Sequence, residues 1–416
     1  EQALLSLQNQ GFAIAMPRDC GESLWCERRL LARIHRYSRA QRRHAVKPVS
    51  PSAFGRFLVR WHGLDDKTAS LDQALNQLEG WSSPAPLWEQ SILGTRCSDY
   101  APQELDQRFL SGELAWFRPA RNSEEPRQII SATPVSIVPR ENMGVWRTGN
   151  AASEAPENPY ARQVLAVLEK HGAMFTRDIE DETGMLRPHL EEGLKALVYS
   201  GIATADAFSP LRWLLRPEKI KIRQERRRAG GGLPVGRWSL VTPSNSEGET
   251  DRPAEHRQQE LATICAALLR RYGVVFRAAI QRESHLPPWR YLLAYLRRME
   301  DRGEVRGGRF VDGFSGEQFA LPEAVGLLRQ CREESDNKSL VVISAADPLN
   351  LGGWILAGPR TPAAMNNRVL LEDGLPVARM MAHEVEELPG ISSAARARAR
   401  DLLTIVRPWK KSGTRY

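Results

Sequence analysis

Apolar residues recur along this chain at the spacing of short amphipathic helices, and each group of helices is followed by alternating apolar stretches. The clearest sign is an internal repeat, in which HGAMFTRDI (171–179) matches YGVVFRAAI (272–280). Each copy follows an amphipathic stretch, YARQVLAVLEK or ELATICAALLRR, and precedes further helical sequence and a ribbon. Helices, a glycine and a two-stranded ribbon, in that order, are typical of a winged helix, which is a helix-turn-helix with a β-hairpin wing.

A further and more diverged copy, which comes first along the chain, runs from SPSAFGRFLVRW to ELAWFRPA. Gly112, Gly201 and Gly303 stand where the wings of the three copies open. We expect the ribbon of the second copy at IATADAFSPLRWLL (202–215) and that of the third copy at EVRGGRFVDGFSGEQFAL (304–321). The chain therefore holds three modules of similar size.

The two ends of the chain have sequence patterns that differ from those of the three repeated modules. GFAIAMP, near the start, reads as a wing strand, and LWCERRLLARIHRYSRAQRR reads as a basic helix. Near the end, short apolar runs joined by Gly, Pro and Asp-Gly turns predict a small β-barrel, closed by a helix with Ser392 or Ser393 as its N-cap. The expected fold is α+β, with tandem winged-helix modules followed by a small β-barrel. The expected domains are 1–45 (end of a winged helix), 46–150, 151–240 and 255–325 (winged helices) and 338–411 (barrel with C-terminal helix).

Length and composition narrow the class of protein. A chain of 416 residues is long enough for several domains, and no apolar run approaches the roughly 18 residues of a membrane span, so we expect a soluble protein with no membrane partner. Together with the charge and the cysteines described next, this leads us to expect a cytoplasmic location in association with the nucleoid. The net charge of +8 and the abundance of arginine favour a polyanionic partner. Five scattered cysteines fit a reducing compartment and disfavour zinc. The chain begins with Glu1 in mid-pattern, which suggests a piece of a longer protein, and it has no P-loop for an ATPase motor.

The third ribbon contains the first candidates for DNA binding. Gly307 and Gly308 predict a tight hairpin with positive backbone angles, flanked at its tip by Arg306 and Arg309. On a wing such arginines can straddle a phosphate backbone or enter a minor groove. The alternative is an exposed hairpin whose arginines serve solubility.

Further candidates lie before this ribbon. In LPPWRYLLAYLRRMEDR, helical spacing turns Arg290 and Arg297 outward, and Trp289 either stacks on a base or has a structural role. Arg277, in the repeated segment, joins the same set. The run KIKIRQERRR is either a solvated face or a flexible arm that follows a nucleic-acid strand; its candidates are Arg226, Arg227 and Arg228.

One carboxylate is a candidate for catalysis. Asp347, in ISAADPLNLGG, follows an apolar strand and precedes a proline. Such a residue commonly ends a strand in an Asx turn. It is alternatively a carboxylate fixed at a strand end in a cleft, where it would orient water or stabilise a cationic sugar.

Three long stretches together resemble a known family. They are SPSAFGRFLVRW to ELAW, RRYGVVFRAAIQRE to GEQFALPEAV, and VVISAADPLNLGGWI. They resemble the C-terminal region of the bacterial large helicase-related proteins (Lhr) over roughly residues 10–385. The resemblance implies DNA repair, an N-terminal helicase core of the same protein as a partner, single-stranded or damaged DNA as a ligand, and homo-oligomerisation.

That region is in turn similar in architecture to the AlkZ/YcaQ class of DNA glycosylases, and uracil-DNA glycosylase activity is associated with some members. The resemblance thus implies base excision without a metal or redox cofactor. The Gln-x-Gln motif of that class is absent, since Ser82 and Pro84 stand where its glutamines would be. ISAADPLNL is similar to the strand-terminating F-D-x-L element of the class, which makes Asp347 the expected catalytic residue.

Three hypotheses for function follow. The first is a DNA glycosylase that excises uracil or another damaged base. The second is a non-catalytic module that binds DNA and assembles subunits. The third, a transcriptional regulator, is weaker, because the recognition-helix segment RPHLEEGLKAL carries two glutamates.

Overall fold

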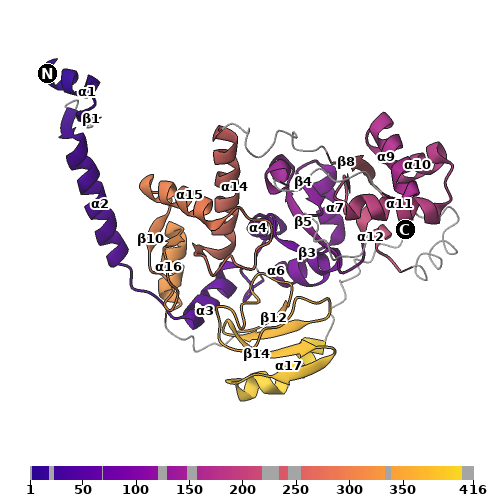
Figure 1. The fold of residues 1–416 in the computed structure, drawn as a ribbon. Helices are drawn as coiled ribbons and strands as arrows, with labels where there is room; N and C mark the ends of the chain where they lie inside the picture. Colours follow the sequence, from indigo (N-terminus) through magenta and orange to yellow (C-terminus); the bar gives the residue numbers. More distant parts are fainter. Residues whose placement is uncertain are drawn as a thin grey trace.

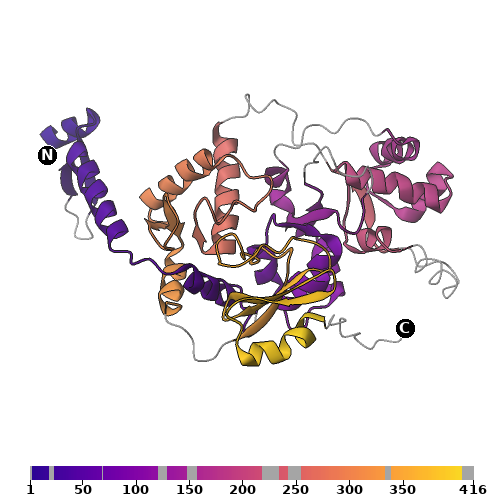
Figure 2. The ribbon, with the colours of Figure 1, turned by 60° about the horizontal axis from the view of Figure 1, so that its bottom comes forward.

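The N-terminal residues form an arm that extends from the body of the molecule (Figures 1 and 2). The structure is a computed structural model that describes residues 2–17, 23–67, 69–119, 129–147, 157–217, 234–241, 254–332 and 339–404. We call residues 2–44 the arm. Its elements are α1 (Gln2–Asn9), β1 (Ala13–Pro17), β2 (Ser23–Glu27) and α2 (Arg28–His44). The predicted basic helix starts later than expected, because residues 23–27 pair with β1 as a strand.

The first module starts with α3, whose N-cap Ser50 accepts the backbone N–H of Ala53. Its three strands form an antiparallel sheet in the order β3-β5-β4. Gly112 follows α7 with a φ of +84° and so turns the chain into β4. The elements are α3 (Pro51–Trp61), α4 (Leu71–Gln77), β3 (Ser82–Pro84), α5 (Ala85–Leu87), η1 (Trp88–Leu93), α6 (Gly94–Arg96), α7 (Pro102–Leu110), β4 (Leu114–Phe117), β5 (Pro134–Pro139), η2 (Arg140–Asn142) and α8 (Met143–Trp146).

The second module repeats this order, with Gly201 at a φ of +69° before its wing. Its elements are α9 (Pro159–His171), β6 (Met174–Phe175), α10 (Thr176–Thr183), α11 (Arg187–Tyr199), β7 (Ala203–Ala205), α12 (Ser209–Leu214) and β8 (Arg237–Leu240). The ribbon predicted at 202–215 is wrong in its second half. Ser209–Leu214 is a helix, with Pro210 in its first turn, and the strand that pairs with β7 is β8.

In the third module the predicted hairpin tip at Gly307 and Gly308 is wrong. Its elements are α14 (Ala254–Tyr272), β9 (Val274–Val275), α15 (Trp289–Asp301), β10 (Arg306–Gly308), β11 (Gln318–Ala320) and α16 (Pro322–Gln330). Gly303, at a φ of +80°, opens the wing as predicted. Gly307 and Gly308, in contrast, lie inside β10 and neither has a positive φ, so Arg306 and Arg309 do not flank a hairpin tip. The two glycines serve close packing, which is described below.

The C-terminal residues form a four-stranded antiparallel sheet in the order β12-β13-β14-β15, covered by a helix. The helix begins at its N-cap Ser392, whose Oγ accepts the backbone N–H of Ala395 at 3.0 Å. The barrel predicted for this region stays a prediction, as do the domain boundaries. The elements are β12 (Leu340–Ser344), β13 (Arg368–Glu372), β14 (Leu375–Met381), β15 (Glu384–Glu387) and α17 (Ser393–Thr404).

The hydrophobic cores do not follow the order of the modules along the chain. One core joins α3 to the third module and to the four-stranded sheet. A Cβ on Gly273 would lie 2.5 Å from Cζ of Phe57, so the contact between α14 and α3 requires a glycine there. A second core joins the first module's sheet to the second module, and a third lies beneath α17. None of the described helices is long and apolar enough to cross a membrane.

Candidate functional site

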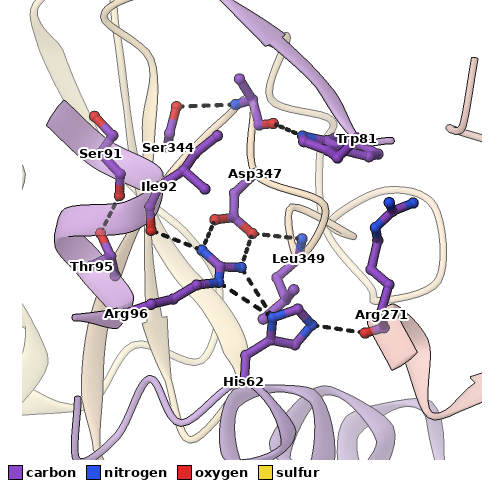
Figure 3. Close-up of polar contacts among 11 residues, drawn as sticks. His62, Trp81, Ser91, Ile92, Thr95, Arg96, Arg271, Ser344, Asp347 and Leu349 are labelled. Atoms are coloured by element: carbon purple, nitrogen blue, oxygen red, sulfur yellow. Dashed lines mark hydrogen bonds and ion pairs between the residues drawn. The ribbon is translucent and has the colours of Figure 1, made fainter. Parts of the chain in front are cut away.

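Asp347 lies just after strand β12 and is completely buried. Its carboxylate accepts two hydrogen bonds from the Arg96 guanidinium, at 2.7 Å (Nη1–Oδ2) and 3.1 Å (Nη2–Oδ1), as Figure 3 shows. Oδ1 also accepts the backbone N–H of Leu349 at 3.0 Å, which closes an Asx turn. The carboxylate is therefore fixed by a strand end, a turn and a bidentate ion pair.

His62 lies on the other side of the Arg96 guanidinium (Figure 3). Its Nδ1 lies 3.3 Å from Nε and 3.2 Å from Nη2 of Arg96, and its Nε2 lies 2.8 Å from the carbonyl oxygen of Arg271. Burial and the positive charge of Arg96 lower the pKa of His62 to about 3. The imidazole is therefore neutral near pH 7. Its Nε2–H donates a hydrogen bond to the carbonyl oxygen of Arg271, and its Nδ1 accepts hydrogen bonds from the Arg96 guanidinium.

The charge state of Asp347 follows from two opposed effects. Burial alone raises the pKa of the carboxyl, whereas the charge and hydrogen bonds of Arg96 lower it by more. The pKa of Asp347 thus lies below its ordinary value, and the carboxylate is ionised near neutral pH. An ionised carboxylate at a rigid strand end is suited to orienting water or stabilising a cation, but here Arg96 already occupies it.

The buried pair joins segments that are far apart in the sequence. Arg96 ends α6 of the first module, His62 follows α3, and Asp347 belongs to the C-terminal region. Trp81 adds a further link by donating its Nε1–H to the carbonyl of Ala346 at 3.0 Å. The centre therefore lies where three parts of the body meet.

A second buried cluster adjoins the first through Arg271. The fully buried guanidinium of Arg271 contacts Glu283, which also accepts a hydrogen bond from the Tyr272 hydroxyl at 2.9 Å. Burial and the charge of Glu283 raise the pKa of Tyr272 well above its ordinary value. Tyr272 therefore stays a hydrogen-bond donor, and the third module is tied to the centre by charged side chains without exposure to solvent. Among the described residues, no group of three or more His, Cys, Asp or Glu side chains is arranged to hold a metal ion.

The arginines that the sequence singled out lie elsewhere, on the surface of the third module. Arg306 and Arg309 are exposed on either side of the β10 glycines, and Arg277 and Arg290 are exposed as well. Asp347, in contrast, has no exposed surface. The predicted DNA-binding residues are therefore open to solvent, whereas the predicted catalytic carboxylate is not.

The remaining candidates differ from one another. Arg297 is exposed but donates to Glu317 at 2.7 Å. Trp289 is half-buried and packs against the main core. These contacts favour a structural role over stacking on a base. The candidates in the basic run, Arg226, Arg227 and Arg228, lie outside the described residues.

The sequence reasoning missed a contact between the arm and the third module. Arg43 of α2 donates from Nε to Glu300 at 2.8 Å and from Nη1 to Glu317 at 2.5 Å. A Cβ on Gly307 would lie 2.3 Å from Oε1 of Glu300 and 2.8 Å from Nε of Arg43. Because Gly307 has no side chain, the Arg43–Glu300 ion pair can lie directly against strand β10. A signal was present, since the segment that forms α2 was already recognised as a basic helix.

Three small antiparallel sheets, each built into a helical module that opens its wing at a positive-φ glycine, define a protein of tandem winged helices. Comparison with known families agrees. Residues 49–134 and residues 254–340 each match a family model described as large helicase-related protein, winged-helix domain.

Two curated proteins are similar over most of the chain. "Lhr helicase/uracil glycosylase" of Escherichia coli (strain K12) is 28% identical over 413 residues, which is 88% of this chain and 26% of that protein. "Lhr helicase/ probable uracil glycosylase" of Mycolicibacterium smegmatis (strain ATCC 700084 / mc(2)155) is 28% identical over 373 residues, which is 82% of this chain and 23% of that protein. The chain is thus a region related to the C-terminal part of the Lhr proteins, and it spans about a quarter of the length of these relatives.

Proposed function

We propose that this chain is a DNA-binding region of a helicase-related protein that acts in DNA repair, and that it releases uracil or another damaged base from DNA. The observation that carries the binding part is that four arginines of the third module, Arg277, Arg290, Arg306 and Arg309, are all exposed. Arginine pairs bidentately with phosphate, and the third module is one of the two matched to Lhr winged helices. The names of both relatives support the base-release part.

The proposed reaction is hydrolysis of the bond between the base and C1′ of the sugar. The target nucleotide leaves the base stack, at a cost of a few kcal/mol in duplex DNA and less in a single strand. The bond from C1′ to the base nitrogen breaks, the base departs with the bonding electrons and takes up a proton, and water adds its hydroxyl to C1′. A carboxylate stabilises the cationic sugar and accepts the proton of the water.

Asp347 is the residue we propose for this role. The low pKa of the carboxyl keeps it ionised, as the role requires. Its complete burial sets a condition, because substrate must reach it before it can act. Binding of DNA must therefore separate Arg96 from Asp347, or the sugar must approach through a local opening between the first module and β12.

The experiment is an excision assay. The 416-residue chain is incubated with single-stranded and duplex oligonucleotides that carry uracil or one of a panel of modified bases, and abasic sites are then cleaved with alkali. The proposal expects strand cleavage for at least one base. Binding of the oligonucleotides without cleavage for any base would contradict base release and leave DNA binding in place.

A second candidate function is a non-catalytic module that binds DNA and assembles copies of the protein. The observation that favours it is the apolar surface of the arm, where Phe12, Leu30, Ile34 and Tyr37 are between 48% and 66% exposed. Leu30, Ile34 and Tyr37 share one face of α2, because they are four and three residues apart. We propose a second copy of the chain as the partner that covers this face. The mass in solution tests it.

A further inference from the structure

Helix α2 forms one wall of a cleft beside the third module. Three ion pairs hold the helix in place: Arg43 binds Glu300 and Glu317, and Arg39 contacts Asp301. In Figure 1 the last turns of α2 run down toward β10 and α16. The opposite wall consists of the turn after α15, β10 and α16. The cleft has a volume of about 790 Å³.

Positive charge dominates the cleft. Arg36 and Arg42 line it from α2, Arg306 from β10 and Arg329 from α16. All four are exposed, and within the part of the chain that the structure describes none of them contacts a carboxylate. The acids of the lining, Glu300 and Asp301, are already bound to arginines of α2. Because both walls are positive, the field inside the cleft is stronger than over a flat surface of the same charge.

We propose that this cleft binds the phosphodiester backbone of one nucleic-acid strand. The inference rests on the proposed DNA binding and gives it a site and a ligand class. Arginines on both walls can pair bidentately with phosphates that pass between them. The described lining contains no Trp, Tyr or Phe on which a base could stack, so the contacts are to phosphate and independent of base sequence.

The size of the cleft selects a single strand. Sites of roughly 300–1,000 Å³ enclose drug-sized ligands, which corresponds to one or two nucleotides. A duplex is too wide to enter, and α2 covers part of the wing strand that a winged helix would otherwise present to it. One strand can pass through the cleft while the rest of the DNA lies on the exposed surface of the third module.

The test compares two double variants that remove the same charge. R42Q/R329Q removes one arginine from each wall, and R398Q/R400Q removes two exposed arginines from α17 as the control. Fluorescence anisotropy measures binding of the full 416-residue chain to an unstructured 20-nucleotide strand and to its duplex between 50 and 200 mM salt. Each lost phosphate contact should lower the slope of log K against log salt by about 0.7, or roughly fivefold in affinity at 0.1 M salt. R42Q/R329Q should therefore bind the strand roughly 25-fold more weakly, with a slope lower by about 1.4, and the control should change far less.

The outcomes separate the inference from the proposed function. If the unaltered chain binds neither DNA, the proposed function fails. If it binds the strand and both double variants bind equally well with the same slope, the cleft is not the site and the inference is overturned. Loss of duplex binding alone in R42Q/R329Q overturns the assignment to a single strand. Equal melting temperatures of the two variants exclude misfolding as a cause.

Discussion

The guanidinium of Arg96 and the carboxylate of Asp347 meet in two hydrogen bonds across 251 residues of sequence, and neither side chain is exposed to solvent. The pair joins the first winged-helix module to the C-terminal sheet. Removing one partner of such a pair leaves a buried charge without compensation, whereas replacing both with apolar residues of similar volume is often neutral. This asymmetry makes the contribution of the pair to stability separable from any part it has in chemistry.

We expect D347N to lower the free energy of unfolding by about 3–5 kcal/mol, because Arg96 stays buried without its counter-ion. The double variant R96M/D347L should recover most of this loss. Chemical denaturation of the parent chain, both single variants and the double variant measures the coupling. A double variant as unstable as D347N would show that the centre depends on the charges themselves.

The neutral state of His62 predicts a dependence of stability on pH. The pKa of His62 falls from its ordinary value near 6.5 to about 3 on folding, so between these values the unfolded chain binds the extra proton. Stability should therefore rise with pH in this window, and this residue should contribute about 1.4 kcal/mol per pH unit.

The measurement is denaturation between pH 4 and pH 7, with H62Q as the comparison. A glutamine is neutral at every pH and can still accept from Arg96, so H62Q should show a shallower dependence on pH by that amount. The low pKa of Asp347 acts in the same direction, but only at more acidic pH, where its carboxylate becomes protonated in the unfolded chain. Equal slopes for H62Q and the parent chain would contradict a buried neutral imidazole.

The close packing at Gly307 predicts that a side chain at this position weakens the contact between the arm and the third module. A methyl group at this position would overlap Oε1 of Glu300 and crowd Nε of Arg43, so these side-chain ends must shift, and weakening of their ion pair costs about 1 kcal/mol. G307A should therefore speed amide hydrogen exchange in α2 by roughly fivefold. G326A, in helix α16, has nothing within 4 Å of the added methyl group and should leave α2 unchanged. Equal protection of α2 in both variants would refute the packing role of Gly307.

The apolar face of α2 predicts self-association. Ile34 is 48% exposed, so I34D leaves the fold of a single copy intact while placing a charge on this face. We expect the parent chain to exceed the mass of a monomer by light scattering and I34D to return to it. R28Q, which alters an exposed arginine on the other side of α2, is the control. A monomeric parent chain would refute a second copy as the partner of the arm.

Local features of the fold could be predicted from the sequence, because they depend on neighbouring residues. Gly112, Gly201 and Gly303 all take positive φ where the repeat placed the wings, and Ser392 caps the last helix. The ribbon of the second module was wrong, since its return strand comes from residues 237–240, well beyond the wing glycine. Sequence spacing cannot indicate a strand that returns after so long an insertion.

The contacts of the candidate site were less accessible to prediction. Asp347 was identified from its place after a strand, and both its Asx turn and its ionised state agree with that position. Its partner Arg96 was not identified, because no local sequence pattern indicates a contact between residues that are 251 positions apart. Gly307 was predicted at a hairpin tip, but it lies within strand β10. There its missing side chain makes room for Arg43, which is distant in the sequence.

The most direct test of the account is uracil release by a folded variant that lacks the buried carboxylate. R96M/D347L and the parent chain are each incubated with a uracil-containing single strand, after melting and anisotropy have verified that both fold and bind it. We predict that the parent chain releases free uracil and that the double variant binds the strand but releases none above background. Release at the parent rate by the double variant would contradict the role of Asp347, and no release by the parent chain would contradict base excision itself.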